Sequence, residues 1–455
     1  MRFLRVIIRI DVPSPFELNR SKHKTMRNII IIGNGISGVT AAREIRKRSD
    51  DHITIISDEH PYFFSRTALM YVFMGHMKKE HLKPYADAFW EKNRIALLSD
   101  RVNGIDFENK MLRLDKNNPV SYDVLILATG SLPNKFGWPG QDLKSVSGLY
   151  HMGDLDRLEK WSGSIRHGVI VGGGLIGIEL AEMLLSRGKT VTFLVRESGF
   201  WNIVLPPEES SMINRHIREH GIDLRLNTEL KEIIDNGRGE ASAVTTSKNE
   251  TIDCQFVGLT AGVHPNVGWL KNTSLDIARG ILVDQYLKTN QDQVYAIGDC
   301  AQLRTPRPGR RPIEAVWYTG KMMGRTAAQN ICGTPIEYDP GIWFNSAKFL
   351  DIEYQTYGFI PPSPDDSTHT FYWEHPDGKK SLRINFDKET GEVRGFNLMG
   401  IRFRHKVCER WLKEQKPIDY VMHHLEEANF DPEFYARQEK DIRQAYAQQF
   451  HTTFA

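Results

Sequence analysis

The sequence predicts an α/β fold in which one supersecondary unit occurs twice and a C-terminal region of α+β type follows. A short apolar strand, a glycine loop and a helix occur near the start of the chain and recur about 140 residues later. No third glycine loop follows, and residues 380–399 alternate as a strand hairpin does before a helical tail. The glycines of the two loops are Gly33, Gly35 and Gly38, and Gly172, Gly174 and Gly177.

Length and composition exclude several classes of protein. A chain of 455 residues predicts roughly three domains, and 40% hydrophobic with 25% charged residues is typical of a globular protein. A formal net charge of +2 argues against nucleic acid or an anionic membrane as a partner. No apolar run reaches the ~20 residues that span a bilayer. The four cysteines fit neither a metal site nor a disulfide framework, which predicts no metal and a reducing, cytoplasmic location.

The first unit has the order of a dinucleotide-binding site. An uninterrupted β-branched strand at 29–32 leads into the loop, where Gly33 allows the tight turn and Gly35 lets the backbone approach a pyrophosphate. Gly38 lets the helix pack closely on the strand, and the helix N-terminus offers N–H groups to the anion. A second strand at 53–57 ends at Asp58 and Glu59, about 20 residues beyond the last glycine, where an acid accepts hydrogen bonds from a ribose 2′-hydroxyl.

The second unit repeats this order but lacks the acid. Its strand at 168–171, its loop and its second strand at 190–195 imply a second dinucleotide, because each unit holds one pyrophosphate. Val195 and Arg196 stand where an NAD-preferring unit carries Asp or Glu. An arginine there can pair with a 2′-phosphate, which favours NADPH over NADH. Two alternatives stay open, because Glu197 is close by and Arg196 is equally consistent with a solvated residue at the strand end.

Two further strands end in small or acidic residues. A buried strand at 124–128 ends in Ala128, Thr129 and Gly130, and another at 294–297 ends in Gly298 and Asp299. The carboxyl ends of strands in an open α/β sheet are where ligands bind. These residues are therefore expected at the same site as the first loop.

The order of these motifs resembles the pyridine nucleotide–disulfide oxidoreductase superfamily over about residues 27–340. Within it the chain is similar to the FAD-dependent branch of ferredoxin and rubredoxin reductases, nitrite-reductase-type flavodomains and apoptosis-inducing-factor-like proteins. The resemblance implies two Rossmann-like domains that bind FAD and NADPH or NADH.

The resemblance also implies roles for individual residues. The first loop would hold the FAD pyrophosphate, Asp58 or else Glu59 the adenosine ribose, Arg66 the FAD phosphates and Asp299 the ribityl chain. The candidate catalytic residues are Glu179, near flavin and nicotinamide, and Glu314, in the segment that covers the flavin pyrimidine end with Trp317 and Tyr318. For these two aromatic residues core packing is an equal alternative. The remaining cofactor-binding candidates are Ala128, Thr129, Gly130, Gly172, Gly174, Gly177, Arg196, Gly262 and Gly298.

Two departures from the family pattern matter. No Cys-x4-Cys follows the first loop and residues 64–71 hold no cysteine, so no redox disulfide is expected and Cys300 is interpreted as a small buried residue. Tyr71 stands where reductase relatives often carry a lysine near the flavin. Without a thiol pair, reduced flavin must pass its electrons outside the chain.

These observations predict domains and a function. The FAD domain is expected to be split over about 27–148 and 264–338, with the NAD(P) domain at 149–263 and a C-terminal interface or acceptor domain at 339–455. Aromatic residues at 338–357 are expected to pack against the FAD domain. The first functional hypothesis is an NAD(P)H reductase that feeds a ferredoxin- or rubredoxin-type carrier protein. The alternatives are an NAD(P)H oxidase or quinone reductase, and a redox-sensing flavoprotein; a homodimer is a further expectation from the resemblance.

The first 25 residues match none of these elements. They mix Arg, Pro, Asn, Lys and acids around one short apolar patch, unlike a signal or transit peptide. Met26 directly precedes the first strand. We expect residues 1–26 to be a disordered or mis-assigned extension ending at a biological start at Met26, so that a chain starting there binds flavin.

Overall fold

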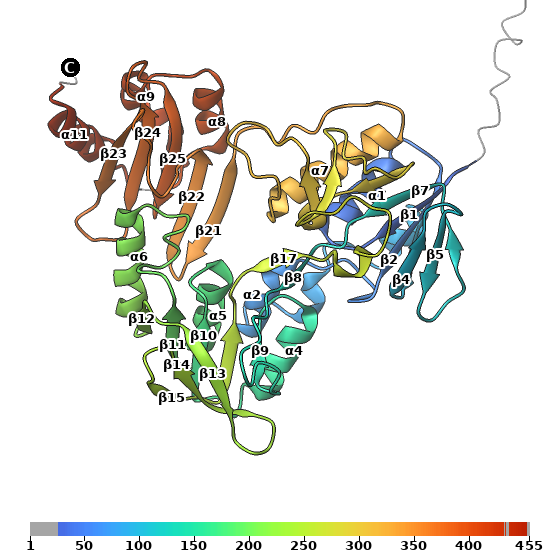
Figure 1. Ribbon diagram of the computed structural model, residues 1–455. Coiled ribbons are helices and arrows are strands. Elements are labelled where there is room, and N and C mark those ends of the chain that lie inside the picture. The colour runs from blue at the N-terminus through green and yellow to red at the C-terminus, as the bar shows by residue number, and fades with distance from the viewer. Residues whose placement is uncertain (1–25, 432, 434–435, 453–455) are drawn as a thin grey trace, which may run out of the picture.

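The computed structural model describes residues 26–431, 433 and 436–452, so the expected N-terminal extension up to residue 25 lies outside the described residues. The described chain forms two parallel-sheet units and an antiparallel C-terminal domain (Figure 1). The predicted fold class, α/β with two Rossmann-like units and a C-terminal α+β domain, is confirmed.

The first unit is a five-stranded parallel sheet with strand order β19-β7-β1-β2-β3. Strand β1 (Asn28–Ile32) is central and nearly inaccessible to solvent, as its β-branched run predicts. The other strands are β2 (His52–Ser57), β3 (Ile95–Ser99), β7 (Val124–Leu127) and β19 (Val294–Ala296). Strand β19 therefore returns to the first sheet after the whole second unit (Figure 1).

Two helices lie side by side over this sheet. Helix α1 (Ile36–Arg46) and helix α7 (Trp317–Ile331) approach so closely that a Cβ on Gly324 would lie 2.5 Å from the backbone oxygen of Ser37. Smaller elements complete the unit: α3 (Ala88–Lys92), β4 (Val102–Asp106), β5 (Met111–Leu114), β6 (Val120–Ser121), β18 (Ile281–Val283) and β20 (Ala301–Leu303). Helix α2 (Leu69–Phe73) instead packs into the core of the second unit. The 3-10 turns are η1 (Arg66–Ala68), η2 (Lys79–Leu82), η3 (Gly268–Leu270) and η4 (Gly298–Cys300).

The second unit has the same architecture, with strand order β12-β11-β10-β16-β9. Its strands are β9 (Val146–Ser147), β10 (His167–Val171), β11 (Thr190–Val195), β12 (Asp223–Leu226) and β16 (Phe256–Leu259). Its helices are α4 (Met152–Trp161), α5 (Leu175–Ser186) and α6 (Pro207–Glu219), and a meander of β13 (Leu230–Asp235), β14 (Ala241–Thr246) and β15 (Thr251–Asp253) is added. Helix α6 starts with Pro207 and acids in its first turn, both of which favour a helix N-terminus. The antiparallel pair of β8 (Ser131–Pro133) and β17 (Val263–Pro265) joins the two units.

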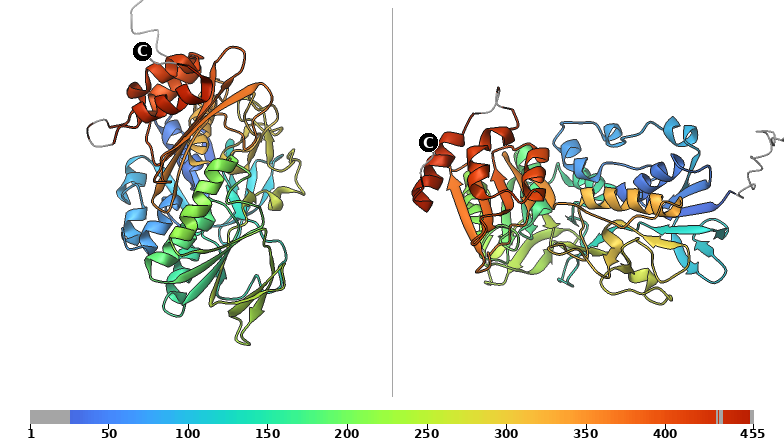
Figure 2. Two further views of the ribbon diagram at one scale, coloured as in Figure 1. Left: turned by 90° about the vertical axis from the view of Figure 1, so that its left-hand side faces the viewer. Right: turned by 90° about the horizontal axis from the view of Figure 1, so that it is seen from above.

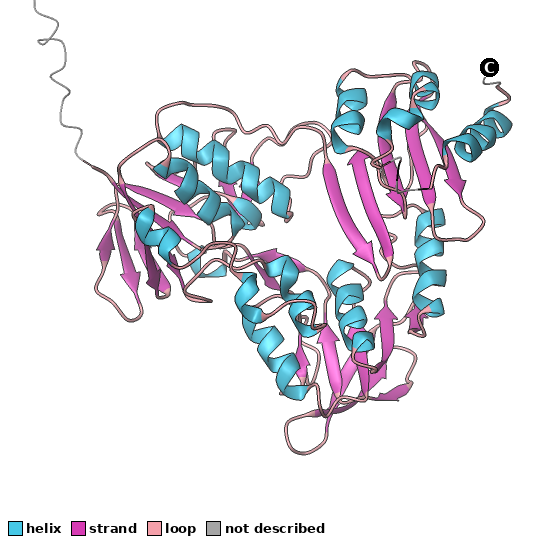
Figure 3. Ribbon diagram, turned by 180° about the vertical axis from the view of Figure 1, so that it is seen from behind, coloured by secondary structure: helices cyan, strands magenta, loops and turns pink. Residues whose placement is uncertain are grey.

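The C-terminal domain is a five-stranded antiparallel sheet with order β21-β22-β25-β24-β23, flanked by helices (Figure 3). Its strands are β21 (Phe344–Phe349), β22 (Ile352–Gly358), β23 (Thr368–Glu374), β24 (Ser381–Asp387) and β25 (Val393–Met399). Its helices are α8 (His405–Lys413), α9 (Ile418–His423), α10 (Leu425–Ala428) and α11 (Glu439–Phe450). Trp411 of α8 is fully buried against this sheet. No helix in the described part of the chain is long and apolar enough to cross a membrane.

The C-terminal domain packs on the second unit, beside α6 (Figures 1 and 2). Arg383 of β24 forms ion pairs with Glu209 at 2.7 Å and with Glu208 at 2.6 Å. The side chain of Glu209 is fully buried. The tip of the β21–β22 hairpin also shares an apolar core with α5 and α6. The expected packing of residues 338–357 on the first unit is therefore correct for Tyr338 but wrong for Tyr354, which packs against Trp201 of the second unit.

Candidate active site

The first glycine loop has the backbone geometry of an anion cradle. Gly33 has a φ of +111°, and a Cβ there would lie 2.1 Å from the backbone oxygen of Ala128, so only glycine fits. A Cβ on Gly35 would meet no atom within 4 Å, which leaves that side of the loop open. Helix α1 begins directly after Gly35, and its first N–H groups face the open side of the loop. The loop can therefore hold a pyrophosphate.

The second loop repeats this geometry. Gly172 has a φ of +117°, and a Cβ there would lie 2.6 Å from the backbone oxygen of Thr260. Gly174 again faces open space, and α5 begins directly after it. Gly38 and Gly177 also correspond, since a Cβ on either would collide with the backbone oxygen of the first glycine of its own loop.

Backbone hydrogen bonds define which residues of the two units are equivalent. The N–H of Gly33 donates to Ile56 at 2.8 Å, and the N–H of Gly172 donates to Leu194 at 3.0 Å. Two residues beyond these acceptors stand Asp58 in the first unit and Arg196 in the second. The two units therefore carry opposite charges at the same position.

The strand pairing also gives Gly262 a counterpart. The N–H of Ala128 donates to Ile32 at 2.8 Å, and the N–H of Thr260 donates to Val171 at 2.9 Å. Two residues later stand Gly130 and Gly262, with φ values of +68° and +83°. A small pocket between the two units is lined by Gly262 together with Gly148, Tyr150, Ile176 and Thr260.

Of the two acids after β2, Asp58 faces solvent and Glu59 faces the protein. The Asp58 side chain is 51% exposed and pairs with Arg101 at 2.9 Å. Glu59 pairs with Arg66 at 2.6 Å and with His151 at 3.2 Å. Burial alone raises the pKa of Glu59, but these hydrogen bonds and charges outweigh it and lower that pKa to about 2. Glu59 therefore positions Arg66, and Asp58 is the more exposed of the two acids.

Arg66 is held over two aromatic rings at this edge of the sheet. Its guanidinium lies 4.5 Å from the ring centre of Tyr150 and 5.0 Å from that of Phe64, and it donates to the backbone oxygen of Tyr150. Sequence reasoning missed Tyr150 and His151, because they lie in the connection between the two units and belong to no motif. Only the fold brings this connection back to Arg66.

Asp299 lies at the same edge, in the turn η4. The hydroxyl of Ser131 donates to Asp299 at 2.9 Å, and burial raises the pKa of this carboxyl above its usual value. The N–H of Ser131 donates to the Tyr150 hydroxyl at 3.2 Å, which links Asp299 to the Arg66 cluster. Thr129 donates to the backbone oxygen of Asn266 at 3.0 Å and anchors the end of β7 beside them.

Glu179 lies on α5, the helix of the second loop. Burial, with a smaller contribution from Glu182, raises the pKa of Glu179 to about 7. Glu182 itself pairs with Lys348 of the C-terminal domain at 2.9 Å. Glu179 can therefore gain or lose a proton near neutral pH.

The two remaining candidates differ in exposure. Glu314 is nearly buried, and both of its carboxylate oxygens pair with Arg310, at 2.6 and 2.7 Å. Its carboxylate thus positions Arg310, which lies over the ring of Trp343. Trp317, the first residue of α7, is 38% exposed and the adjacent Tyr318 is 36% exposed. The alternative that these two aromatic residues pack in a core is therefore wrong.

The cysteines offer no thiol relay. Cys300 is fully buried, its thiol donates to the backbone oxygens of Leu127 and Ile297, and burial raises its pKa. Cys254, Cys300 and Cys408 form no disulfide. The interpretation of Cys300 as a small buried residue is confirmed.

Residues 27–329 match the family model of the pyridine nucleotide-disulphide oxidoreductases. The chain belongs to this family. Membership confirms the predicted superfamily and the oxidoreductase class, and it implies a flavin and a nicotinamide cofactor. Both glycine loops lie within the matched residues.

The chain covers different shares of its individual relatives. It is 30% identical over 326 residues to rhodocoxin reductase of Rhodococcus erythropolis, covering 71% of this chain and 76% of that protein. It is 25% identical over 395 residues to the assimilatory nitrate reductase electron transfer subunit of Bacillus subtilis (strain 168), of which it spans only 50%. A solved NAD-dependent persulfide reductase from A. fulgidus has the same fold, with a TM-score of 0.82 over 93% of this chain and 83% of its own, at 22% identity.

Proposed function

We propose that this oxidoreductase takes hydride from NADPH onto FAD and delivers electrons to a separate carrier protein of the ferredoxin or rubredoxin type. The observation that carries the proposal is the pair of equivalent glycine loops with opposite charges at the ends of their second strands, Asp58 and Arg196. One loop suits a ribose with a free 2′-hydroxyl, as in FAD, and the other suits a 2′-phosphate, as in NADPH.

The first unit is proposed as the FAD site, with residues 27–148 and 264–338 as its domain. The open side of Gly35 and the start of α1 would hold the pyrophosphate, with Arg66 beside it and Asp58 on the ribose. Asp299 is half-buried, and its carboxyl accepts a hydrogen bond from the Ser131 hydroxyl at this edge, which suits the hydroxyls of a ribityl chain. When bound, FAD supplies the hydride acceptor that can release electrons singly.

The second unit, residues 149–263, is proposed as the NADPH site. The Arg196 side chain is 70% exposed at the end of β11 and pairs only with its neighbour Glu197, at 2.8 Å, among the described residues. Val195 is buried and presents no carboxylate that would repel a 2′-phosphate. A surface pair between adjacent residues is weak, so a phosphate can displace Glu197 from Arg196.

Glu179 is proposed to act where the two units meet. Its helix begins at the loop that would hold the NADPH pyrophosphate, and its neighbour Ile176 lines the pocket between the units. With a pKa of about 7, the carboxyl can hold a proton while charge moves from one cofactor to the other. Trp317 and Tyr318, exposed at the start of α7, are proposed to cover the flavin on the acceptor side.

The electron acceptor is proposed from two observations. Cys254, Cys300 and Cys408 form no disulfide, which leaves no cysteine pair within the chain, so electrons have no disulfide to reach and must leave the chain from the flavin. Rhodocoxin reductase and the electron transfer subunit of nitrate reductase both carry electron-transfer roles in their names. An NAD(P)H oxidase that reduces oxygen directly is the second candidate, because the same site needs no change to serve it.

Anaerobic stopped-flow reduction of the purified flavoprotein tests this proposal. We expect NADPH to bleach the flavin faster than NADH, reoxidation in air to be slow, and an added ferredoxin or rubredoxin to reoxidise the flavin rapidly. Fast reoxidation by air alone would establish the oxidase instead. No bleaching with either nucleotide would overturn both candidates.

A further inference from the structure

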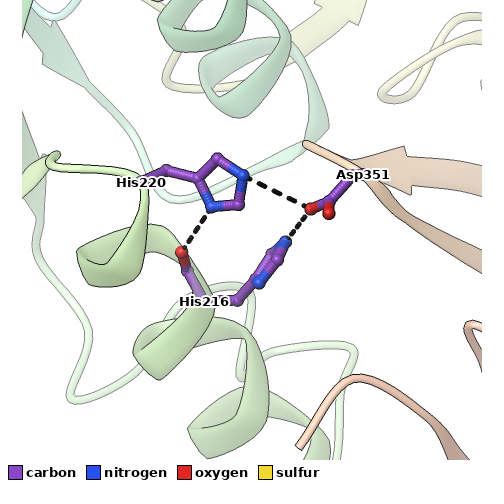
Figure 4. Close-up of side chains that lie close together, drawn as sticks. All are labelled: His216, His220 and Asp351. Atoms are coloured by element: carbon purple, nitrogen blue, oxygen red, sulfur yellow. Dashed lines mark hydrogen bonds and ion pairs between the residues drawn. The ribbon is translucent and has the colours of Figure 1, made fainter. Parts of the chain in front are cut away.

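Two histidines and an aspartate converge where the second unit meets the C-terminal domain, away from the glycine loops (Figure 4). His216 lies in the last turn of α6, and His220 caps that helix. Asp351 comes from the other domain, in the turn between β21 and β22. One ligand atom from each residue lies within 4.8 Å of the other two.

The hydrogen bonds fix how His220 presents its ring. Its Nδ1 lies 2.9 Å from the backbone oxygen of His216, and because a carbonyl oxygen only accepts, Nδ1 must carry the hydrogen. In the neutral ring the lone pair is therefore on Nε2, which faces an oxygen of Asp351 at 3.4 Å. A lone pair and a carboxylate oxygen repel each other unless a positive charge lies between them. A backbone oxygen that orients the far nitrogen is also the usual support of a metal-binding histidine.

His216 completes the set from inside the protein. Its side chain is 1% exposed, and its Nε2 contacts the same oxygen of Asp351.

The remaining nitrogen of His216 and the helix end also suit a cation. Nδ1 of His216 is buried without a hydrogen-bond partner, and a carboxylate oxygen of Glu219 lies 3.7 Å from it. The C-terminus of α6, where both histidines lie, carries the negative end of the helix dipole.

We propose that His216, His220 and Asp351 bind one divalent transition-metal ion of the Zn²⁺ type, which ties the C-terminal domain to the second unit. Two imidazole nitrogens at i and i+4 of a helix and one carboxylate leave the fourth tetrahedral position for water. In such a site ligand atoms about 2.1 Å from the metal are roughly 3.4 Å apart. The separation of His220 Nε2 and Asp351 matches this, whereas His216 Nε2 contacts Asp351 directly, so the carboxylate must turn away from His216 to admit the ion. Asp351 is 58% exposed, so its carboxylate is free to turn onto the ion.

The ion would add one more contact to the interface between α6 and the C-terminal domain, which ion pairs already stabilise. Arg383 pairs with Glu208 and Glu209 at the start of α6, and Arg215 pairs with Glu374 near its middle. The metal site lies at the end of the same helix. Imidazole ligands favour Zn²⁺, Co²⁺ and Cu²⁺ over Mg²⁺ and Ca²⁺, which prefer oxygen.

Metal binding to the full-length flavoprotein tests this proposal. After removal of metals with a chelator and dialysis, Zn²⁺ is titrated against a zinc-sensitive dye and Co²⁺ is followed by its tetrahedral d–d absorption in difference spectra. We expect one ion per chain at micromolar affinity or tighter, no binding of Mg²⁺, and a rise in Tm of roughly 3–8 °C with excess Zn²⁺.

Variants separate this site from other zinc ligands. The lead variant is His220→Gln, because this side chain is 32% exposed and its loss is tolerated more easily than that of buried His216. We expect His220→Gln to weaken Zn²⁺ at least 30-fold and Asp351→Asn about tenfold, and both to abolish the rise in Tm. The control His81→Gln removes an exposed histidine that lies beside Glu80 and should change nothing. Absence of Zn²⁺ binding by the wild type, or equal binding by His220→Gln, would overturn the proposal.

Discussion

The two glycine-loop units share a backbone and differ in charge. Their first glycines have φ values of +111° and +117°, and in both units the same N–H donates to the second strand. Yet Asp58 in the first unit corresponds to Arg196 in the second. The backbone geometry provides for a pyrophosphate in either unit, because peptide N–H groups are the same whatever the side chains. On the proposed function, the side chain at the end of the second strand selects which dinucleotide binds.

A second difference lies in how each strand-end charge is held. In the first unit Glu59 is fixed by Arg66 and His151 and is partly buried. In the second unit Glu197 pairs only with exposed Arg196 among the described residues.

The largest effects are expected when the first glycine of each loop is replaced, and the two replacements should impair different cofactors. The left-handed φ alone costs on the order of 1–3 kcal/mol for alanine, and the Cβ would also collide with Ala128 or Thr260. We expect Gly33→Ala to lower FAD affinity at least ~10-fold, measured as flavin content after gel filtration. Gly172→Ala should keep its flavin but lose reduction by NADPH. Gly237→Ala is the control, because Gly237 has a φ of +82° with no atom near its Cβ. Loss of flavin in Gly172→Ala alone would refute the assignment of the units.

Removal of the Arg196 charge should have the next largest effect, on the use of NADPH. A charge-assisted hydrogen bond contributes about 1.5–3 kcal/mol, so Arg196→Ala should lower kcat/KM for NADPH roughly 10–100-fold and leave NADH nearly unchanged. Steady-state reduction of ferricyanide measures both. Arg225→Ala removes an exposed arginine paired with Asp223 on the neighbouring strand β12 and should change neither value. An equal loss for both nucleotides would show that Arg196 does not select the 2′-phosphate.

Glu179 should make flavin reduction by NADPH dependent on pH. Because its pKa is about 7, the rate of flavin reduction by NADPH should change with a midpoint near pH 7, by up to about tenfold, and Glu179→Gln should remove this dependence. The exposed Glu229→Gln is the control. A pH profile unchanged in Glu179→Gln would exclude the proposed role.

Stability gives an independent test of the same carboxyl. Its folded-state pKa lies above the ordinary 4.5, so the folded state binds more protons between pH 4.5 and 7. The contribution of Glu179 to stability is therefore full below pH 4.5 and is lost as the pH rises to 7. Urea unfolding at pH 5 and pH 8 should show a smaller difference for Glu179→Gln than for the wild type.

The smallest effect is expected at Asp58. An asparagine keeps an oxygen that accepts from the ribose hydroxyl and loses only a solvent-screened charge, so Asp58→Asn should weaken FAD about 3–10-fold. Fluorescence titration of the apoprotein with FAD measures this. Asp292→Asn also breaks a surface ion pair in this unit, with Lys110, and should leave FAD affinity unchanged. If Glu59→Gln instead weakened FAD binding more than Asp58→Asn did, at unchanged stability, Glu59 would be the ribose ligand.

Much of this comparison could be predicted from local sequence. In each unit the loop, its two strands and the charged residue that follows the second strand lie within about 30 residues. The spacing of the glycines therefore predicts them. The inward turn of Glu59 could not be predicted, because its partner His151 lies 92 positions further along the chain. The ion pair of Glu314 with Arg310, four residues before it, also follows from no motif.

The sequence by itself determined the two loops, the strands that flank them and the absence of a thiol pair, because these depend on short-range patterns of glycine, β-branched residues and cysteine. Only the tertiary structure decided that Tyr150 supports Arg66, that Arg383 enters a buried ion pair with Glu209, and that His216 and His220 meet Asp351. These contacts join segments far apart in the chain. Their partners are chosen by how whole sheets and helices pack, and no local pattern records that packing.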